Sequence, residues 1–166
     1  MVAGTIAAAI SMRLIPPVSP AYLTSRLLAL TLRDLRRLAV GRRWLNQRDW
    51  TGIISERIAA MPADAPLVHL AQLVAGLSVG EAVIHLRGTR SRLAGREALD
   101  KALACLATAD TAGTRQWLSR FGAQQPQGEA PGALAGMRGL AAVTVIADAL
   151  TQHADFFGSI GLSVRR

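Results

Sequence analysis

Hydrophobic residues recur at the spacing of an α-helix along most of the chain. Between Pro20 and Ala39, apolar residues fall on one arc of a helix at about 100° per residue, and the arginines fall on the opposite side. Three prolines within residues 16–20 predict a stiff extended lead-in, and Pro20 suits the first turn of a helix. Gly41 predicts the C-terminal end. This stretch is therefore expected to be an amphipathic helix with one core face and one cationic face.

The polar side of this helix, continued into the turn after it, is a candidate membrane or partner surface. Its residues are Arg26, Arg33, Arg36, Arg37, Arg42 and Arg43. Such a stripe is most often the solvated side of a helix, but contact with anionic lipid headgroups would use the same residues. A nucleic-acid surface would use Arg33, Arg36, Arg37, Arg42, Arg43 and Arg48. Asp34 lies near one edge of the apolar arc, three residues before Arg37, which predicts an ordinary solvent-exposed ion pair.

Five further helices follow from the same periodicity and from the capping residues between them. They are expected from Asn46 or Asp49 to Met61, over 67–86 or slightly beyond, over 95–109, from Asp110 or Thr111 to Phe121, and over 133–157. A basic turn is expected at 87–92, and the glycine- and proline-rich stretch 122–132 predicts a mobile loop. The pattern predicts an all-α, single-domain bundle of five or six helices.

The helix over 67–86 is apolar nearly all round and is long enough to raise the question of a membrane span. Gly76 and Gly80 form a GxxxG pair, which permits close helix packing. Four strongly polar residues, His69, Gln72, Glu81 and His85, would be costly in hydrocarbon. We therefore expect a buried helix of the bundle rather than a transmembrane helix.

Composition adds a cationic bias to this picture. The 166 residues include 19 basic and 11 acidic side chains, for a net charge of +8, and a single lysine among the basic ones. A negatively charged partner would explain this balance, and so would a genomic preference for Arg and Ala codons. Leu and Ala supply most of the apolar residues, which favours helices over sheets.

No pattern of catalytic residues is evident. The lone Cys105 lies in an apolar run without a neighbouring base, and the three histidines are not at metal-ligand spacing. Glu81 and His85 share a helix face, where a polar contact is a commoner arrangement than an acid/base pair. Phosphate-binding glycine loops and a nucleophile elbow are absent. The sequence predicts no enzyme, no cofactor and no metal site.

Residues 1–12 are apolar and uncharged, and they are too short to span a bilayer alone. No basic residue precedes them, as a signal peptide would require, and Arg13 follows them. We expect 1–12 to be the cytoplasmic end of a membrane segment, 13–20 a proline-rich linker, and 21–166 a cytosolic helical bundle.

Four stretches together resemble one protein family. They are Arg13-Leu14-Ile15-Pro16-Pro17, the helix from Arg26 to Ala39, the segment from Trp50 to Pro62 with Glu56-Arg57-Ile58, and His153-Ala154-Asp155-Phe156-Phe157. In their order and spacing they are similar to the C-terminal cytosolic part of the fusaric acid resistance (FUSC) family of bacterial inner-membrane efflux proteins.

The resemblance implies an exporter of aromatic acids or similar toxic compounds, which often works with a periplasmic adaptor. The sets of transmembrane helices of the family are not found in this sequence, so the fragment is not expected to transport by itself. The implied role is a cytosolic module for assembly or regulation at the cytoplasmic face of the inner membrane. Its expected partners are the transmembrane part of the same or an adjacent chain, an anionic membrane surface and a second copy. The alternative is a basic nucleic-acid-binding helical regulator.

Overall fold

The computed structural model describes residues 19–42, 45–126 and 133–159, and the described residues form helices without any strand. In chain order the elements are α2 (Pro20–Ala39), α3 (Gln47–Ala59), α4 (Leu67–Thr89), the 3-10 helix η1 (Arg90–Arg92), α5 (Arg96–Ala107), α6 (Thr111–Ala123), α7 (Ala133–Gln152) and α8 (Ala154–Gly158). The predicted all-α bundle is confirmed. Its described part has one α-helix more than the six expected, because the last predicted helix is divided in two.

Side-chain caps fix where three of the helices begin. The Ser19 hydroxyl accepts a hydrogen bond from the backbone N–H of Tyr22 at the start of α2 (3.2 Å). Asn46 and Asp110 cap α3 and α6 in the same way, each at 2.8 Å. These side chains satisfy backbone donors that have no partner inside the helix. At the other end of α2, Gly41 has a φ of +71°, a conformation that glycine adopts without strain.

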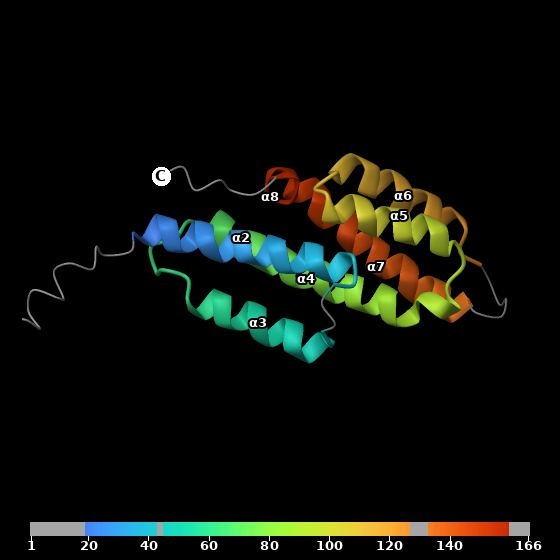
Figure 1. Cartoon of the computed structure of the whole chain (residues 1–166), viewed down its shortest axis with the longest axis horizontal. Coiled ribbons are helices and arrows are strands. Elements are labelled where there is room, and N and C mark those ends of the chain that lie inside the picture. The colour runs from blue at the N-terminus through green and yellow to red at the C-terminus, as the bar shows by residue number, and fades with distance from the viewer. Residues whose placement is uncertain (1–18, 43–44, 127–132, 160–166) are drawn as a thin grey trace, which may run out of the picture.

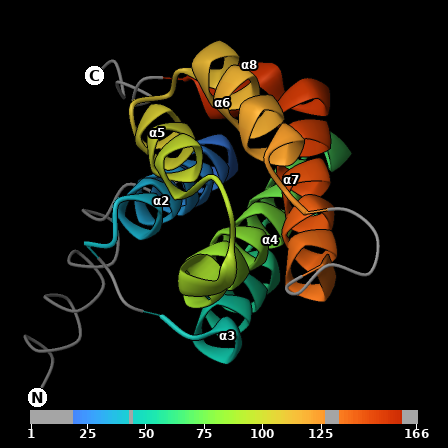
Figure 2. The same cartoon turned by 90° about the vertical axis from the view of Figure 1, so that its right-hand side faces the viewer.

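Helix α4 lies at the centre of the bundle and contacts α2, α3 and α7. Figure 1 shows α2 and α4 side by side and running in the same direction, with α3 below them. Viewed along the bundle, α4 stands between α2 on one side and α7 on the other (Figure 2). Helices α5 and α6 pack against each other and close the bundle over α2 and α7.

The two glycines of the GxxxG pair set how closely α4 approaches its neighbours. A Cβ atom on Gly76 would lie 2.8 Å from the Thr31 methyl group of α2, and one on Gly80 would lie 2.1 Å from the Trp50 ring of α3. Trp50 is fully buried, and its ring Nε1–H donates a hydrogen bond to the Leu77 carbonyl (3.0 Å). The pair therefore serves packing within the bundle, and the tryptophan joins α3 to α4 through both an apolar contact and a hydrogen bond.

The prediction that the helix over 67–86 is buried is right for the side that carries Leu73, Gly76 and Gly80, and wrong for the other side of its first half. Leu67 is 82% exposed, and Val68 and Val74 are also exposed. The reason is that α2, α3 and α7 surround only part of the helix.

Other predicted helix ends shift by a few residues, and the predicted loop at 122–132 begins later than expected because Gly122 and Ala123 belong to α6. Arg87, which was expected in a turn, belongs to the last turn of α4, and the turn itself is η1. The single helix predicted over 133–157 breaks at His153. The break lets α8 turn toward α6, where the rings of Phe156 and Phe157 are buried edge to face, with centroids 4.9 Å apart.

Several predictions fall on residues that the structure does not describe. The apolar end at 1–12, residues 13–18 of the linker, Arg43, and residues 127–132 of the predicted loop all lie outside the described ranges. Within the described part of that loop, Gln125 is buried, and its side-chain amide donates to the carbonyls of Ala94 (2.8 Å) and Phe121 (3.1 Å).

We expect Gly80→Ala to lower the free energy of unfolding by about 1–3 kcal/mol, because the new methyl group would overlap the Trp50 ring. Gly88→Ala is the matched control in the same helix, since a Cβ there meets no atom within 4 Å. It should raise the free energy of unfolding by about 0.5–1 kcal/mol. Urea unfolding followed by circular dichroism measures both, and equal effects would contradict the packing role of Gly80.

Candidate membrane or partner surface

The predicted arginine surface is formed in large part, and the structure divides its members into two groups. Four of the arginines are exposed, and they are Arg26, Arg33, Arg37 and Arg42. The exposed arginines of α2 lie on the side of the helix away from the buried residues of its core face. Arg43 lies outside the described residues.

Arg36 is different because its side chain connects two helices. Its guanidinium donates to the carbonyls of Phe157 (3.4 Å) and Ser159 (2.5 Å), at the C-terminal end of α8. Partial burial lowers the pKa of Arg36, although an arginine remains charged at neutral pH. The positive charge suits carbonyl groups at a helix C-terminus. Arg36 therefore fixes α8 against α2 and is not freely available to a partner.

The prediction that Asp34 is solvent-exposed and paired with Arg37 is wrong. Asp34 is only 6% exposed, and its carboxylate accepts a hydrogen bond from Arg57 of α3 in a buried ion pair. Arg57 also donates to the Thr31 hydroxyl (3.1 Å). The cause is that α3 folds back so that its last turn meets the edge of the apolar arc of α2. These residues join α2 to α3.

Two hollows lie beside the C-terminal end of α2 and share Val40 as a lining residue. The first, of about 260 Å³, lies between α2 and α5, and we call it the arginine hollow. It is lined by Arg36, Arg37, Val40, Arg42, Ala107 and Thr108. Among the described residues, no acidic side chain lines the arginine hollow. It therefore concentrates positive charge beside the apolar side chains of Val40 and Ala107.

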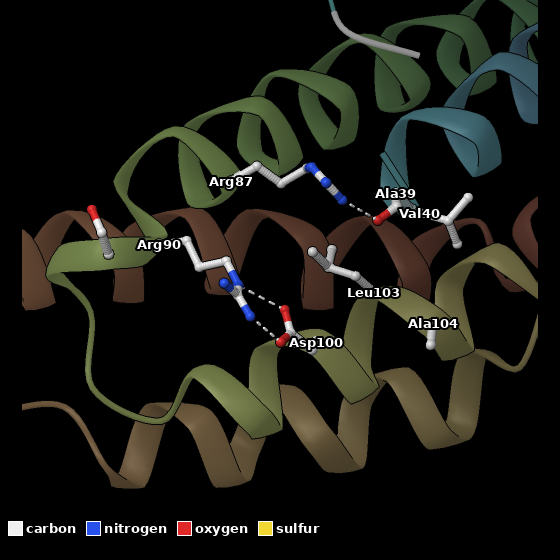
Figure 3. A pocket seen from close by; sticks show the side chains of 8 residues that line it. Ala39, Val40, Arg87, Arg90, Asp100, Leu103 and Ala104 are labelled. Atoms are coloured by element: carbon white, nitrogen blue, oxygen red, sulfur yellow. Dashed lines mark hydrogen bonds and ion pairs between the residues drawn. The ribbon is translucent and has the colours of Figure 1, made fainter. Parts of the chain in front are cut away.

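The second hollow, of about 570 Å³, lies between the ends of α2 and α4 and one side of α5 (Figure 3). Arg87 crosses it to donate to the Ala39 carbonyl (2.7 Å), and Arg90 donates to Asp100, with Nε to Oδ1 at 2.9 Å. Both arginines are already paired with groups of the protein. The Arg87 contact satisfies a carbonyl in the last turn of α2 and covers Gly41, where a Cβ would overlap the guanidinium.

An apolar groove of about 580 Å³ runs between α4 and α7, on the side of α4 away from α2. Its lining is mostly aliphatic, and the residues are Leu67, Leu70, Ala71, Val74, Ala75, Ser78, Val145, Asp148, Ala149, Gln152 and His153. Leu134 and Met137 of α7 are also exposed. Exposed aliphatic side chains on two adjacent helices make this face a candidate contact surface.

By length and composition, two described helical stretches would be able to cross a membrane: Leu67–Arg92, which contains α4 and η1, and Ala133–Gln152, which is α7. In each, 39% of the most apolar 18-residue stretch is buried within the bundle. The core helix of a soluble protein can have the same length and composition. The same two helices form the apolar groove.

The candidate acid/base pair does not come together. Glu81 accepts a hydrogen bond from the Thr51 hydroxyl of α3 (2.9 Å), and no hydrogen bond joins it to His85. Burial, together with Asp110, raises the pKa of the Cys105 thiol, which disfavours the reactive thiolate. Among the described residues, no group of three or more His, Cys, Asp or Glu side chains is placed to hold a metal ion.

The fold and surfaces define an all-α bundle with one cationic face and one apolar face. The model of the fusaric acid resistance protein family (FUSC) matches residues 1–157, so this chain belongs to the FUSC family. The resemblance of the sequence to the FUSC family is thereby confirmed. The chain is related to membrane efflux transporters. No curated protein and no solved structure matches it.

Sequence reasoning found the exposed arginines and missed the residues that are paired. The one signal for the Asp34–Arg57 pair was the position of Asp34 at the edge of the apolar arc rather than opposite it. The roles of Arg36 and Arg87 had no local signal, because their partners are backbone carbonyls 121 and 48 residues away in the sequence.

We expect Asp34→Ala to lower the free energy of unfolding by about 3–5 kcal/mol, because it leaves the buried Arg57 without its counter-charge. Asp34→Leu combined with Arg57→Met should recover part of this loss, since no uncompensated charge remains. Asp100→Ala is the control at an exposed pair and should have little effect. Urea titration measures all three, and a small effect of Asp34→Ala would contradict the structural role of the pair.

Proposed function

We propose that this chain is the cytosolic helical module of a FUSC efflux transporter for aromatic acids or similar toxic compounds. Its role is in assembly or regulation, at the cytoplasmic face of the bacterial inner membrane, and the fragment does not transport by itself. Membership of the FUSC family supports the efflux context. The observation that carries the assembly role is that the bundle has two dissimilar surfaces on different sides of α4. No observation favours the alternative of a nucleic-acid-binding regulator.

The cationic surface is the proposed contact with anionic lipid. Arg26, Arg33 and Arg37 are spaced along the exposed side of α2, at intervals of seven and four residues, so they lie on one face of the helix. Among the described residues, none of the three is in an ion pair. A row of free arginines gains electrostatic attraction to a negatively charged leaflet without first breaking contacts within the protein.

The apolar groove is the proposed contact with the transmembrane part of the same or an adjacent chain. Leu67 and Val74 of α4 and Val145 of α7 present aliphatic side chains there. Burying such side chains against apolar helices is favourable by about 25 cal/mol per Å². A partner in or next to the membrane fits best, because α4 and α7 have the length and apolarity of membrane helices.

Removal of the exposed arginines of α2 tests the proposed lipid contact. The triple variant carries Arg26→Gln, Arg33→Gln and Arg37→Gln. It should bind phosphatidylglycerol vesicles about 100-fold more weakly at low salt, because each arginine near the surface contributes about 1 kcal/mol of attraction to the anionic lipid. Vesicle co-sedimentation measures the partition, and binding of the unaltered chain should fall steeply with added salt.

The matched control removes the same charge elsewhere, with Arg92→Gln, Arg115→Gln and Arg138→Gln, all at exposed positions in η1, α6 and α7. This control should retain most of the binding. Equal loss in both variants, or no binding of the unaltered chain at low salt, would overturn the proposed lipid surface.

Charges placed in the apolar groove test the proposed contact with a membrane partner. In native membranes that contain the partner transporter, the unaltered chain should stay with the membrane after a wash in 1 M salt, which screens the arginine contacts. Val74→Glu with Val145→Glu should release it, because two charges would enter the apolar contact. Both side chains are exposed, so the fold should be kept.

Gln116→Glu with Ser119→Glu on α6 is the control that adds the same charge at exposed positions away from the groove. It should remain with the membrane. Release of the unaltered chain by salt alone would show that the groove does not join it to a membrane partner. Analytical ultracentrifugation of the purified chain tests the competing occupant, and a stable dimer lost in the Val74/Val145 variant would assign the groove to a second copy instead.

A further inference from the structure

The arginine hollow differs from the rest of the cationic surface because it is concave and contains three arginines. Arg37 and Arg42 are exposed at its edge, and Arg36 lies deeper, held by the carbonyls of α8. Val40 and Ala107 supply the apolar part of its lining. Its volume of about 260 Å³ leaves room for a small anion together with several waters, at about 30 Å³ for each water.

The charge in the hollow exceeds what the helix ends require. The C-terminal ends of α2 and α5 meet there, at Val40 and Thr108, and each carries a partial charge of about −0.5. Together they amount to about one negative charge, against three guanidinium groups. The C-terminal end of α8, to whose carbonyls Arg36 donates, contributes about a further −0.5, so a positive charge of about 1.5 is left over.

The remaining two arginines have no acidic partner in the described part of the chain. Arg37 and Arg42 take part in no ion pair or side-chain hydrogen bond there. On the two helices that line the hollow, the acidic residues are already engaged: Asp34 with Arg57, Asp100 with Arg90 and Glu97 with Lys101. An anion that enters the hollow would therefore displace water rather than a protein carboxylate.

We propose that the arginine hollow is a binding site for a phosphomonoester group. A phosphomonoester carries about −1.5 to −2 charges at pH 7, which matches the excess positive charge in the hollow. Its three acceptor oxygens suit the donor forks of two arginines better than the two oxygens of a carboxylate do. The same group occurs on the phosphatidic acid headgroup and on soluble phosphomonoesters. The inference deepens the proposed lipid contact by adding one specific site to it, and in that sense it rests on the proposed function.

The test is a titration of the full chain with glycerol 3-phosphate by isothermal titration calorimetry at low salt. We expect saturable binding with a stoichiometry near one, and Arg37→Gln with Arg42→Gln should weaken it at least tenfold, because charge-assisted hydrogen bonds are lost. Arg26→Gln with Arg33→Gln removes the same charge outside the hollow and should change the affinity less than threefold. Circular dichroism checks that both variants are folded.

Vesicles distinguish the source of the group. Stronger binding to phosphatidic acid than to phosphatidylglycerol at equal surface charge, lost in the Arg37/Arg42 variant, would assign the site to the lipid headgroup. Binding of glycerol 3-phosphate without that lipid preference would assign it to a soluble phosphomonoester. Either result supports the site.

The proposal is overturned if the unaltered chain shows neither glycerol 3-phosphate binding nor a preference for phosphatidic acid, or if both double variants lose affinity equally. This failure is distinct from failure of the lipid surface. Binding to phosphatidylglycerol vesicles that depends on Arg26 and Arg33 would persist without a specific phosphate site.

Discussion

Two glycines one helical turn apart allow α4 to pack closely against α2 and α3 at the same time. Gly76 faces the Thr31 methyl group and Gly80 faces the Trp50 ring, at separations that leave no room for a Cβ. Because protein interiors are close-packed, a methyl group at either position would force the facing side chain, or the helix that carries it, to shift. The positions of α2 and α3, and with them the direction of the arginine face, depend on this contact.

The same close packing explains why the charged residues divide as they do. Once α3 packs beside α2, Asp34 and Arg57 are removed from water together, and each must be the partner of the other. Arg36 and Arg87 lie where helix ends expose carbonyl groups, and they donate to them. The arginines that remain at the surface of α2 are those that the fold does not use, which is why they, and not the whole stripe, form the proposed lipid contact.

The sequence predicted the helices well because their ends are marked by local chemistry. Pro20, Asn46, Asp110 and Gly41 act within a few residues of their own positions, so their effects are visible in the chain itself. The exposed members of the candidate surface were predicted for the same reason, since helical periodicity places them opposite the leucines. The break at His153, the burial of Asp34 and the partners of Arg36 depend on contacts between distant segments, and no local pattern encodes them.

The separation of the two surfaces has a consequence for how the module would work. Figure 2 places α2 and α7 on different sides of α4, so lipid at the arginine face and an apolar partner in the groove would not compete for the same residues. The two contacts also respond to different conditions, because salt screens the first and has little effect on the second. A module bound in both ways would remain attached to its partner when the surface charge of the membrane changes. Its orientation toward the lipid would then depend on the arginines alone, which connects the proposed phosphate site to regulation rather than to attachment.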